Sequence, residues 1–224
     1  MDKLVASADA AVADIPDGAT IMVSGFGLCG NPENLIAALH RKGVKDITLV
    51  SNNCGTTDLG LGVLLKARQI RKIVASYVGE NKEFERQFLA GEVEVDLVPQ
   101  GTLAERIRAG GAGIGGFFTP TAFGTRLAEG KETRNIDGTD YVLEKPIKAD
   151  FALIKADRAD RWGNLTYRKS ARNFGPIMAA AAKITVAQVR EIVELGALDP
   201  EAVVTPSIFV QRVVRVASTL RKAA

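Results

Sequence analysis

The feature that most constrains the fold is a repeated alternation between short apolar strands and amphipathic helical segments. The predicted strands are residues 20–23, 47–50, 73–76 and 93–98. The predicted helices that follow them are residues 31–42, 59–67, 83–89 and 103–109. Because strands that alternate with helices build βαβ units with right-handed crossovers, we predict an α/β fold, a single three-layer domain over residues 1–224 with a mostly parallel sheet.

One long segment departs from this alternation. Residues 110–124 contain six glycines, which predicts a long irregular segment of the kind that is usually functional. Within it, Phe117, Phe118 and Phe123 argue against a freely solvated loop.

Apolar residues at helical spacing predict an N-terminal helix over residues 3–15. Later strands are predicted at residues 141–143, 151–154, 165–167, 185–189 and 209–214, with a helix around residues 179–182.

Charge and cysteine content limit the classes of partner. The 29 basic and 26 acidic residues are spread through the chain, and no basic block is interleaved with aromatic residues, so we expect no nucleic-acid partner. The two cysteines form no CxxC pair, which favours a reducing compartment. No apolar run approaches the roughly 18 residues that span a bilayer, and no signal-peptide core follows the N-terminus. We therefore expect a cytoplasmic protein without a membrane partner.

The first candidate site is the glycine-rich segment that follows the first predicted strand. It consists of Ser24, Gly25, Phe26, Gly27, Leu28, Cys29 and Gly30. Glycines let a backbone approach a ligand, and the helix start at residues 31–33 would present free N–H groups to an anion. The spacing matches neither GxGxxG nor a P-loop. A plain strand–turn–helix junction and a phosphate or carboxylate site are therefore equally good interpretations.

The second candidate site consists of amide side chains at the carboxyl ends of predicted parallel strands, where such sheets bind ligands. Asn52 and Asn53 follow one strand, and Gln100 follows another. Neutral carboxamides can donate hydrogen bonds to a carboxylate or to a thioester carbonyl. The alternative is that the asparagines only stabilise turns, which they strongly favour.

The other reactive side chains give no specific indication of a binding, metal or catalytic site. The basic run at residues 168–172 could bind an anion or a partner protein, although a solvated face is the commoner explanation. His40 is the only histidine and falls in a predicted helix, so we expect neither a metal site nor a Ser/His or Cys/His nucleophile. Glu80, beside Asn81, is interpreted as a surface carboxylate in a charged stretch.

Several motifs, in order along nearly the whole chain, resemble the A subunits of the family I coenzyme A transferases. They are residues 17–32 (DGATIMVSGFGLCGNP), 51–53 (SNN), 76–81 (SYVGEN), 99–108 (PQGTLAERIR), 169–174 (KSARNF) and 199–201 (DPE). Ser24 stands where the family commonly has glycine. The resemblance implies a coenzyme A transferase fold and a partner, the B subunit, in a heterodimer or an α2β2 heterotetramer.

The resemblance also implies the chemistry. In the B subunit, a glutamate attacks an acyl-CoA and forms an anhydride, then a glutamyl-CoA thioester, which splits one difficult acyl transfer into easier steps. The Ser-Glu-Asn-Gly-like motif that carries this glutamate is absent here, since Gly79-Glu80-Asn81-Lys82 differs on both flanks. The resemblance therefore assigns no catalytic nucleophile to this chain. Coenzyme A is then a substrate, and no permanently bound cofactor is expected.

By the same resemblance, residues 24–30 bind coenzyme A, whereas Asn52, Asn53 and Gln100 line the pocket for the carboxylic acid. Gly115, Gly116 and Phe117 would shape the wall of that pocket. The implied reaction moves coenzyme A from succinyl-CoA to a 3-oxoacid, acetoacetate. Residues 160–168 also resemble 3-oxoadipate transferases, so that substrate remains an alternative. A non-catalytic ligand-sensing domain is a further alternative, which a fused helix-turn-helix would favour, but the sequence shows none.

Overall fold

The computed structural model describes residues 2–79 and 81–216 and contains one large central sheet. Its strands are β1 (Thr20–Val23), β2 (Ile47–Val50), β3 (Ile70–Ala75), β4 (Glu94–Leu97), β8 (Ala149–Lys155), β11 (Ala182–Val189) and β13 (Arg212–Arg215). They lie in the order β13-β11-β8-β1-β2-β3-β4, and every neighbouring pair is parallel. The predicted α/β fold with a mostly parallel sheet is confirmed.

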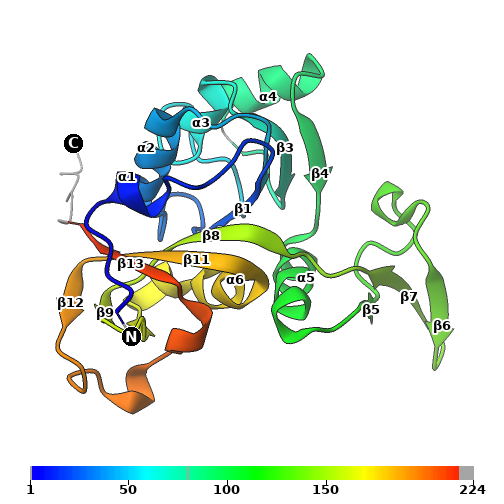
Figure 1. The fold of residues 1–224 in the computed structure, drawn as a ribbon. Coiled ribbons are helices and arrows are strands. Elements are labelled where there is room, and N and C mark those ends of the chain that lie inside the picture. The colour runs from blue at the N-terminus through cyan, green and yellow to red at the C-terminus, as the bar shows by residue number, and fades with distance from the viewer. Residues whose placement is uncertain (1, 80, 217–224) are drawn as a thin grey trace.

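Helices cover both faces of this sheet (Figure 1). They are α1 (Ala8–Ala11), α2 (Glu33–Lys42), α3 (Gly62–Lys66), α4 (Lys82–Leu89), α5 (Gln100–Ala112) and α6 (Gly175–Ala181). Because side chains alternate along a strand, each strand contributes to two cores. In β1, Ile21 and Val23 belong to the core shared with α1 to α4, whereas Met22 belongs to the core shared with α5 and α6. The result is the predicted three-layer arrangement.

The order of the strands determines where a ligand can bind. From β1 the chain builds outward through β2, β3 and β4, and then returns to add β8, β11 and β13 on the other side of β1. In parallel sheets, ligands collect outside the carboxyl ends of the strands near such a reversal. The segments that leave β1, β2, β3 and β4 all emerge at that edge, beginning at Ser24, Ser51, Ser76 and Val98.

The predicted N-terminal helix over residues 3–15 is too long at both ends. Only Ala8–Ala11 is helical, and the Ser7 hydroxyl caps it by accepting a hydrogen bond from the Ala10 N–H at 3.1 Å. Leu4 instead forms a parallel bridge with Val213, and the Val5 N–H donates to the Val213 carbonyl at 2.9 Å. The open edge of β13 recruits this segment from the far end of the chain.

The predicted irregular segment at residues 110–124 is also wrong at its start, because α5 continues through Gly110 and Gly111. A Cβ atom on Gly110 would lie 2.0 Å from the Ile147 carbonyl oxygen, and one on Gly111 would lie 2.8 Å from the Ala180 Cβ. These glycines therefore let α5 pack closely against its neighbours. The helix ends at Gly113, whose φ of 73° forms a left-handed cap.

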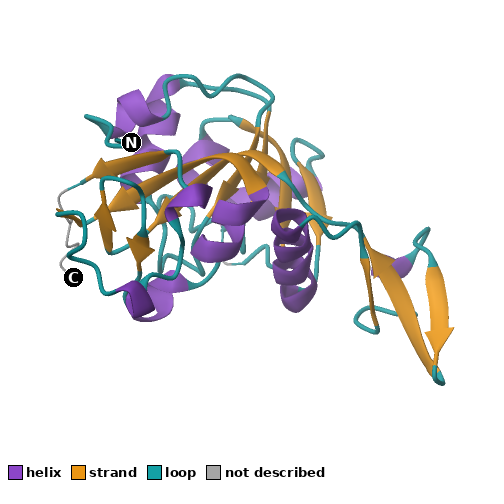
Figure 2. Cartoon of the chain, turned by 60° about the horizontal axis from the view of Figure 1, so that its bottom comes forward, coloured by secondary structure: helices purple, strands orange, loops and turns teal. Residues whose placement is uncertain are grey.

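After α5 the chain forms an arm that projects from the body of the molecule (Figures 1 and 2). It is an antiparallel sheet of β5 (Phe117–Thr119), β7 (Thr139–Glu144) and β6 (Thr133–Ile136), in that order. At its base, the buried Glu144 carboxylate binds Lys131 at 2.7 Å. Strand β6 was not predicted, although Asp137 and Gly138 both have positive φ and form the two-residue turn typical of hairpins.

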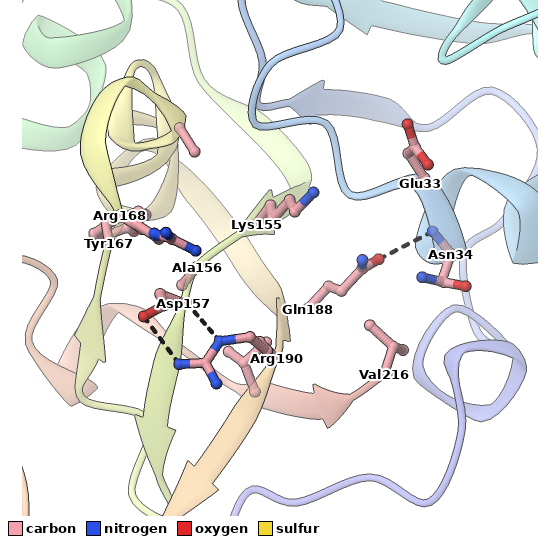
Figure 3. Close-up of a pocket in the computed structure, with 12 residues that line it drawn as sticks. Glu33, Asn34, Lys155, Ala156, Asp157, Tyr167, Arg168, Gln188, Arg190 and Val216 are labelled. Atoms are coloured by element: carbon pink, nitrogen blue, oxygen red, sulfur yellow. Dashed lines mark hydrogen bonds and ion pairs between the residues drawn. The ribbon is translucent and has the colours of Figure 1, made fainter. Parts of the chain in front are cut away.

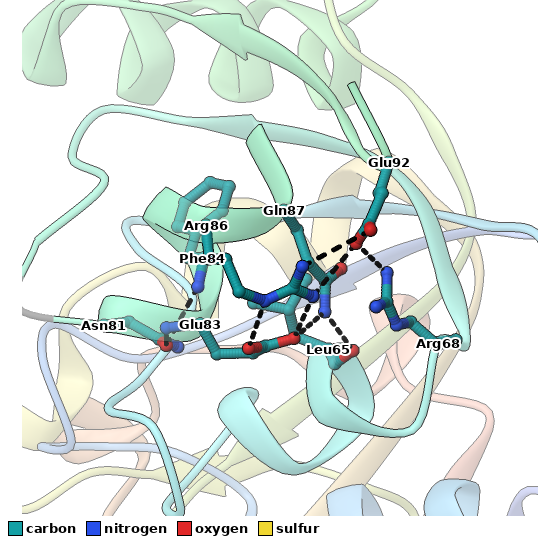
Figure 4. Close-up of polar contacts among 8 residues, drawn as sticks. All are labelled: Leu65, Arg68, Asn81, Glu83, Phe84, Arg86, Gln87 and Glu92. Carbon is teal, nitrogen blue, oxygen red and sulfur yellow. Dashed lines mark hydrogen bonds and ion pairs between the residues drawn. The ribbon is translucent and has the colours of Figure 1, made fainter. Parts of the chain in front are cut away.

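A charged network surrounds α4, and Figure 4 shows its parts. Asn81 caps the helix by accepting from the N–H groups of Glu83 and Phe84, each at 3.1 Å. Hydrogen bonds from Arg86, then Gln87, lower the pKa of Glu83 to about 2. Asn81 is therefore a structural cap, whereas Glu80 lies outside the described residues.

Candidate active site at the carboxyl edge of the sheet

A cavity of about 350 Å³ lies at the carboxyl edge of the sheet, where the segments after four neighbouring strands meet. Its lining residues are Phe26, Gly27, Asn52, Asn53, Ser76, Tyr77 and Gln100. The structure thus brings together the three amides that the sequence placed at strand ends. None of these seven residues is Asp, Glu, Lys, Arg or His, so the cavity offers hydrogen bonds without a charged side chain.

Three side chains in this cavity form a closed hydrogen-bonded triangle. The Asn52 Nδ2 donates to the Ser76 Oγ at 2.9 Å and to the Gln100 Oε1 at 2.7 Å. The Ser76 hydroxyl contacts the same Gln100 oxygen. It also lies within hydrogen-bond distance of a second acceptor, the backbone carbonyl oxygen of Asn52, at 3.1 Å. Asn52 is buried, whereas Gln100 is exposed, so the triangle leads from the interior to the solvent-facing end of Gln100.

The segment of residues 24–30 is a tight hairpin beside the cavity. Phe26 and Cys29 exchange two backbone hydrogen bonds, at 2.9 and 3.0 Å. The buried Ser24 hydroxyl donates to the Gly30 carbonyl at 2.9 Å and closes the base of the hairpin. At the exposed tip lie the apolar side chains of Phe26 and Leu28.

The prediction that the next helix offers free N–H groups to an anion is wrong. The Gln188 Oε1 accepts from the N–H groups of Asn34 and Leu35 at 3.0 and 3.3 Å, and so caps α2 from the neighbouring strand β11. Within the hairpin, the Gly25 N–H donates to Asn173 and the Gly27 N–H to Asn52. Sequence patterns did not reveal these hydrogen bonds because the three acceptor residues lie 25 to 154 positions away from their donors along the chain.

Asn173 was also missed as a residue that holds the hairpin in place. Its Oδ1 accepts from the Gly25 N–H at 3.1 Å, and its Nδ2 donates to the Cys29 carbonyl at 3.0 Å. A Cβ atom on Gly30 would lie 2.6 Å from the Asn173 Nδ2, so glycine is required for this close approach.

Ser76 and Tyr77 were missed as lining residues, although their place after a predicted strand was a usable signal.

A second cavity, of about 210 Å³, lies at the carboxyl ends of β8 and β11 (Figure 3). Gln188 crosses it to reach Asn34, and Arg190 binds Asp157 through a hydrogen bond of 2.9 Å. Arg168, from the basic run, is one of its lining residues. Its charged groups are partly paired, and we assign it no ligand.

Gly115, Gly116 and Phe117 do not line either of these cavities. They follow the C-terminal end of α5, whereas Gln100 is its first residue. A helix of 13 residues is about 20 Å long, so the two groups lie at opposite ends of the element. Their role in an acid pocket remains a prediction that this geometry does not support.

The remaining reactive side chains are engaged elsewhere. Burial raises the pKa of the Cys54 thiol, which makes it a poor nucleophile at neutral pH. The His40 Nδ1 lies 2.8 Å from the Gln69 Oε1, at the C-terminal end of α2. In the described part of the chain, no cluster of three His, Cys, Asp or Glu residues could hold a metal ion. No helix among residues 2–79 and 81–216 has the length and apolar character to span a membrane.

Solved structures share this fold. An acyl-CoA transferase from Escherichia coli O157:H7 superposes with a TM-score of 0.88 at 23% identity over 100% of this chain. This chain spans 49% of that longer polypeptide. Glutaconate coenzyme A-transferase from Acidaminococcus fermentans superposes with a TM-score of 0.83 at 18% identity, covering 96% of this chain and 76% of the other.

Sequence relatives are much closer. The A subunit of a probable succinyl-CoA:3-ketoacid coenzyme A transferase from Bacillus subtilis is 60% identical over 97% of this chain and 92% of its own length. The A subunit of a 3-oxoadipate CoA-transferase from Pseudomonas putida is 57% identical over 100% of this chain and 99% of its own. The family model of the coenzyme A transferases matches residues 5–216. The chain therefore belongs to the coenzyme A transferase family.

Proposed function

We propose that this chain is the A subunit of an enzyme that transfers coenzyme A from succinyl-CoA to a 3-oxoacid, acetoacetate. The observation that carries the proposal is the neutral, amide-lined cavity at the carboxyl edge of the sheet, in a member of this family. Relatives of nearly the same length are named as A subunits, which supports a partner B subunit in a heterodimer or α2β2 heterotetramer. A cytoplasmic location is part of this proposal, since Cys29 and Cys54 are both free thiols.

In this proposal, the nucleophile is a glutamate of the B subunit. Its carboxylate attacks the thioester carbonyl of succinyl-CoA, and coenzyme A leaves as a thiolate. The thiolate then attacks the glutamyl carbonyl of the resulting anhydride, which releases succinate and leaves a glutamyl-CoA thioester. Acetoacetate repeats the two steps in reverse and restores the free glutamate. Coenzyme A acts as a substrate, and no permanently bound cofactor takes part.

The cavity of this chain would serve the two carboxylates that react in turn. A cation in this place would hold each acid tightly and weaken it as a nucleophile, because its charge would be neutralised. Asn52, Asn53 and Gln100 can instead orient a carboxylate through neutral donors, and the same donors can stabilise an oxyanion that develops on the carbonyl. In this division, the present chain positions the substrates, whereas the covalent chemistry occurs on its partner.

Residues 24–30 would contact coenzyme A through the tip of the hairpin rather than through a nest of N–H groups. Five of the N–H groups already donate within the protein, those of Ser24, Gly25, Phe26, Gly27 and Cys29. The exposed side chains of Phe26 and Leu28 remain available as apolar contacts for the pantetheine chain.

3-Oxoadipate is the second candidate acceptor, because a relative named for it is 57% identical along its whole length. The test is to produce this chain with a B subunit of the family, and to measure coenzyme A transfer from succinyl-CoA to acetoacetate and to 3-oxoadipate. We expect transfer by the complex, with the higher kcat/KM for acetoacetate. A preference for 3-oxoadipate would reassign the acceptor, and no transfer to either acid would refute the proposed reaction.

A further inference from the structure

The polarity of the cavity is determined by a chain of hydrogen bonds that starts at a backbone group. The Gly27 N–H can only donate, and it donates to the Asn52 Oδ1 at 3.3 Å. This contact turns the Asn52 carboxamide so that its NH2 group faces Ser76 and Gln100. A flipped Asn52 would place its NH2 group against the Gly27 N–H, and two donors would then face each other. The need of the Gly27 N–H for an acceptor therefore fixes the orientation of the Asn52 carboxamide.

The orientation of Gln100 follows from that of Asn52. Since Asn52 presents a donor at 2.7 Å, the Gln100 atom that meets it must be the carbonyl oxygen, Oε1. The NH2 group of Gln100 then points away from the triangle, toward the exposed end of the side chain. A ligand in the cavity therefore meets a donor at Gln100, which suits a carboxylate and disfavours a cation.

Ser76 is the one member of the triangle that can donate and accept through a single atom, its Oγ. Its hydroxyl accepts from the Asn52 Nδ2 at 2.9 Å, and its single proton has two acceptors within reach, the Asn52 backbone carbonyl at 3.1 Å and the Gln100 Oε1 at a shorter distance. The closer contact favours donation to Gln100. Gln100 lies at the first residue of α5 and is exposed, so packing alone does little to restrict its rotation. Two converging donors, Asn52 and Ser76, hold its oxygen inward.

We propose that Ser76 is a positioning residue that locks Gln100 with its NH2 group toward the bound carboxylate. The proposal rests on the proposed function and assigns a role that neither the sequence motifs nor the family resemblance gave. Without the hydroxyl, one of the two donors to the Gln100 oxygen is lost, and the carboxamide can turn and present an oxygen to an anion. The expected cost is about five- to tenfold in kcat/KM for the acid acceptor, the loss typical of one hydrogen bond.

A double-mutant cycle in the assembled complex tests this coupling. Ser76→Ala should lower kcat/KM for the acid about five- to tenfold in the wild-type background and less than twofold in the Gln100→Ala background. Ser76→Thr keeps the hydroxyl and should stay within about twofold of wild type. Thr185→Val is the matched control, because it removes a buried hydroxyl that donates to the Ala179 carbonyl at 3.0 Å, outside the cavity.

A second measurement separates this inference from the proposed reaction. In the isotope-labelled full chain, the side-chain NH2 signal of Gln100, identified by its loss in Gln100→Ala, should shift in Ser76→Ala and remain in place in Thr185→Val. An unchanged signal, or equal activity losses in both backgrounds, would overturn the role of Ser76. A shifted signal in a complex without transferase activity would keep the positioning role and refute the proposed function instead.

Discussion

Replacing Gln100 by Glu keeps the hydrogen-bonded triangle and changes only the group that faces a substrate. One oxygen of the introduced carboxyl group can accept from Asn52 and Ser76 as the amide oxygen does, so thermal stability should change little. The other oxygen replaces the NH2 donor. Two unit charges about 4 Å apart repel by about 1 kcal/mol in water and about 4 kcal/mol at an effective dielectric constant of 20.

This range corresponds to a loss of roughly 5- to 1000-fold in kcat/KM for the acid acceptor at neutral pH. The exposure of Gln100 favours the lower part of the range, because solvent screens the repulsion. The variant also carries a signature that a simple loss of a contact lacks. Below the pKa of the introduced carboxyl, ordinarily about 4.3, its O–H becomes a donor in place of the amide.

The assay is kcat/KM of the assembled complex for the acid between about pH 3.5 and pH 8, a range that includes the ordinary carboxyl pKa, expressed as the ratio of variant to wild type. The ratio cancels ionisations that both enzymes share. The defect belongs to the ionised form, so it should be complete above the pKa and should shrink as the pH falls through it. Gln100→Ala, which introduces no ionisable group, should give a flat ratio. A flat ratio for Gln100→Glu as well would refute the reasoning.

Three further outcomes test other parts of the structure. Gly110→Ala should lower stability by about 1–3 kcal/mol, because its Cβ would lie 2.0 Å from a backbone oxygen, whereas Gly101→Ala on the same helix, with open space around it, should be neutral or slightly stabilising in thermal unfolding. Asp14→Asn should lower the Tm slightly at pH 7, and the difference should shrink as the pH falls below the ordinary Asp value of 3.8. The reason is that the hydrogen bond from Arg212 lowers the pKa of Asp14, so its stabilisation is complete above the unfolded-state pKa and disappears as the pH falls through the folded-state pKa. The purified chain without its partner should show no transferase activity, and addition of the partner should restore it; turnover by the chain alone at the rate of the complex would contradict this.

Sequence patterning predicted the buried strands well because their residues interact with both helical layers. Residues 20–23 and 47–50 are strands with the predicted bounds, since each is a short apolar run with a clear turn on either side. Patterning failed where a distant partner decides the conformation. Residues 3–5 are extended because they pair with the open edge of β13. Since β13 lies about 200 residues further along the chain, the local sequence pattern could not predict this pairing.

The same contrast applies to the candidate site. The rule for strand ends was sufficient to predict that Asn52 and Gln100 lie together, because the carboxyl ends of neighbouring parallel strands share one edge. It could not reveal their orientation, which depends on the Gly27 N–H. Gly115, Gly116 and Phe117 were grouped with this cavity through the family resemblance alone. In this chain they follow the C-terminal end of α5, whereas Gln100 is its first residue.

The arm is connected to the body like an insertion. Phe117 and Glu144 are paired across β5 and β7, so the chain leaves and re-enters the body at two points only about 5 Å apart. A short turn could join these points without altering the connections among the seven parallel strands. The length of the arm can therefore change without a change to the amide cavity, which lies at the other end of α5. Deleting residues 118–143 gives the experimenter the same independence.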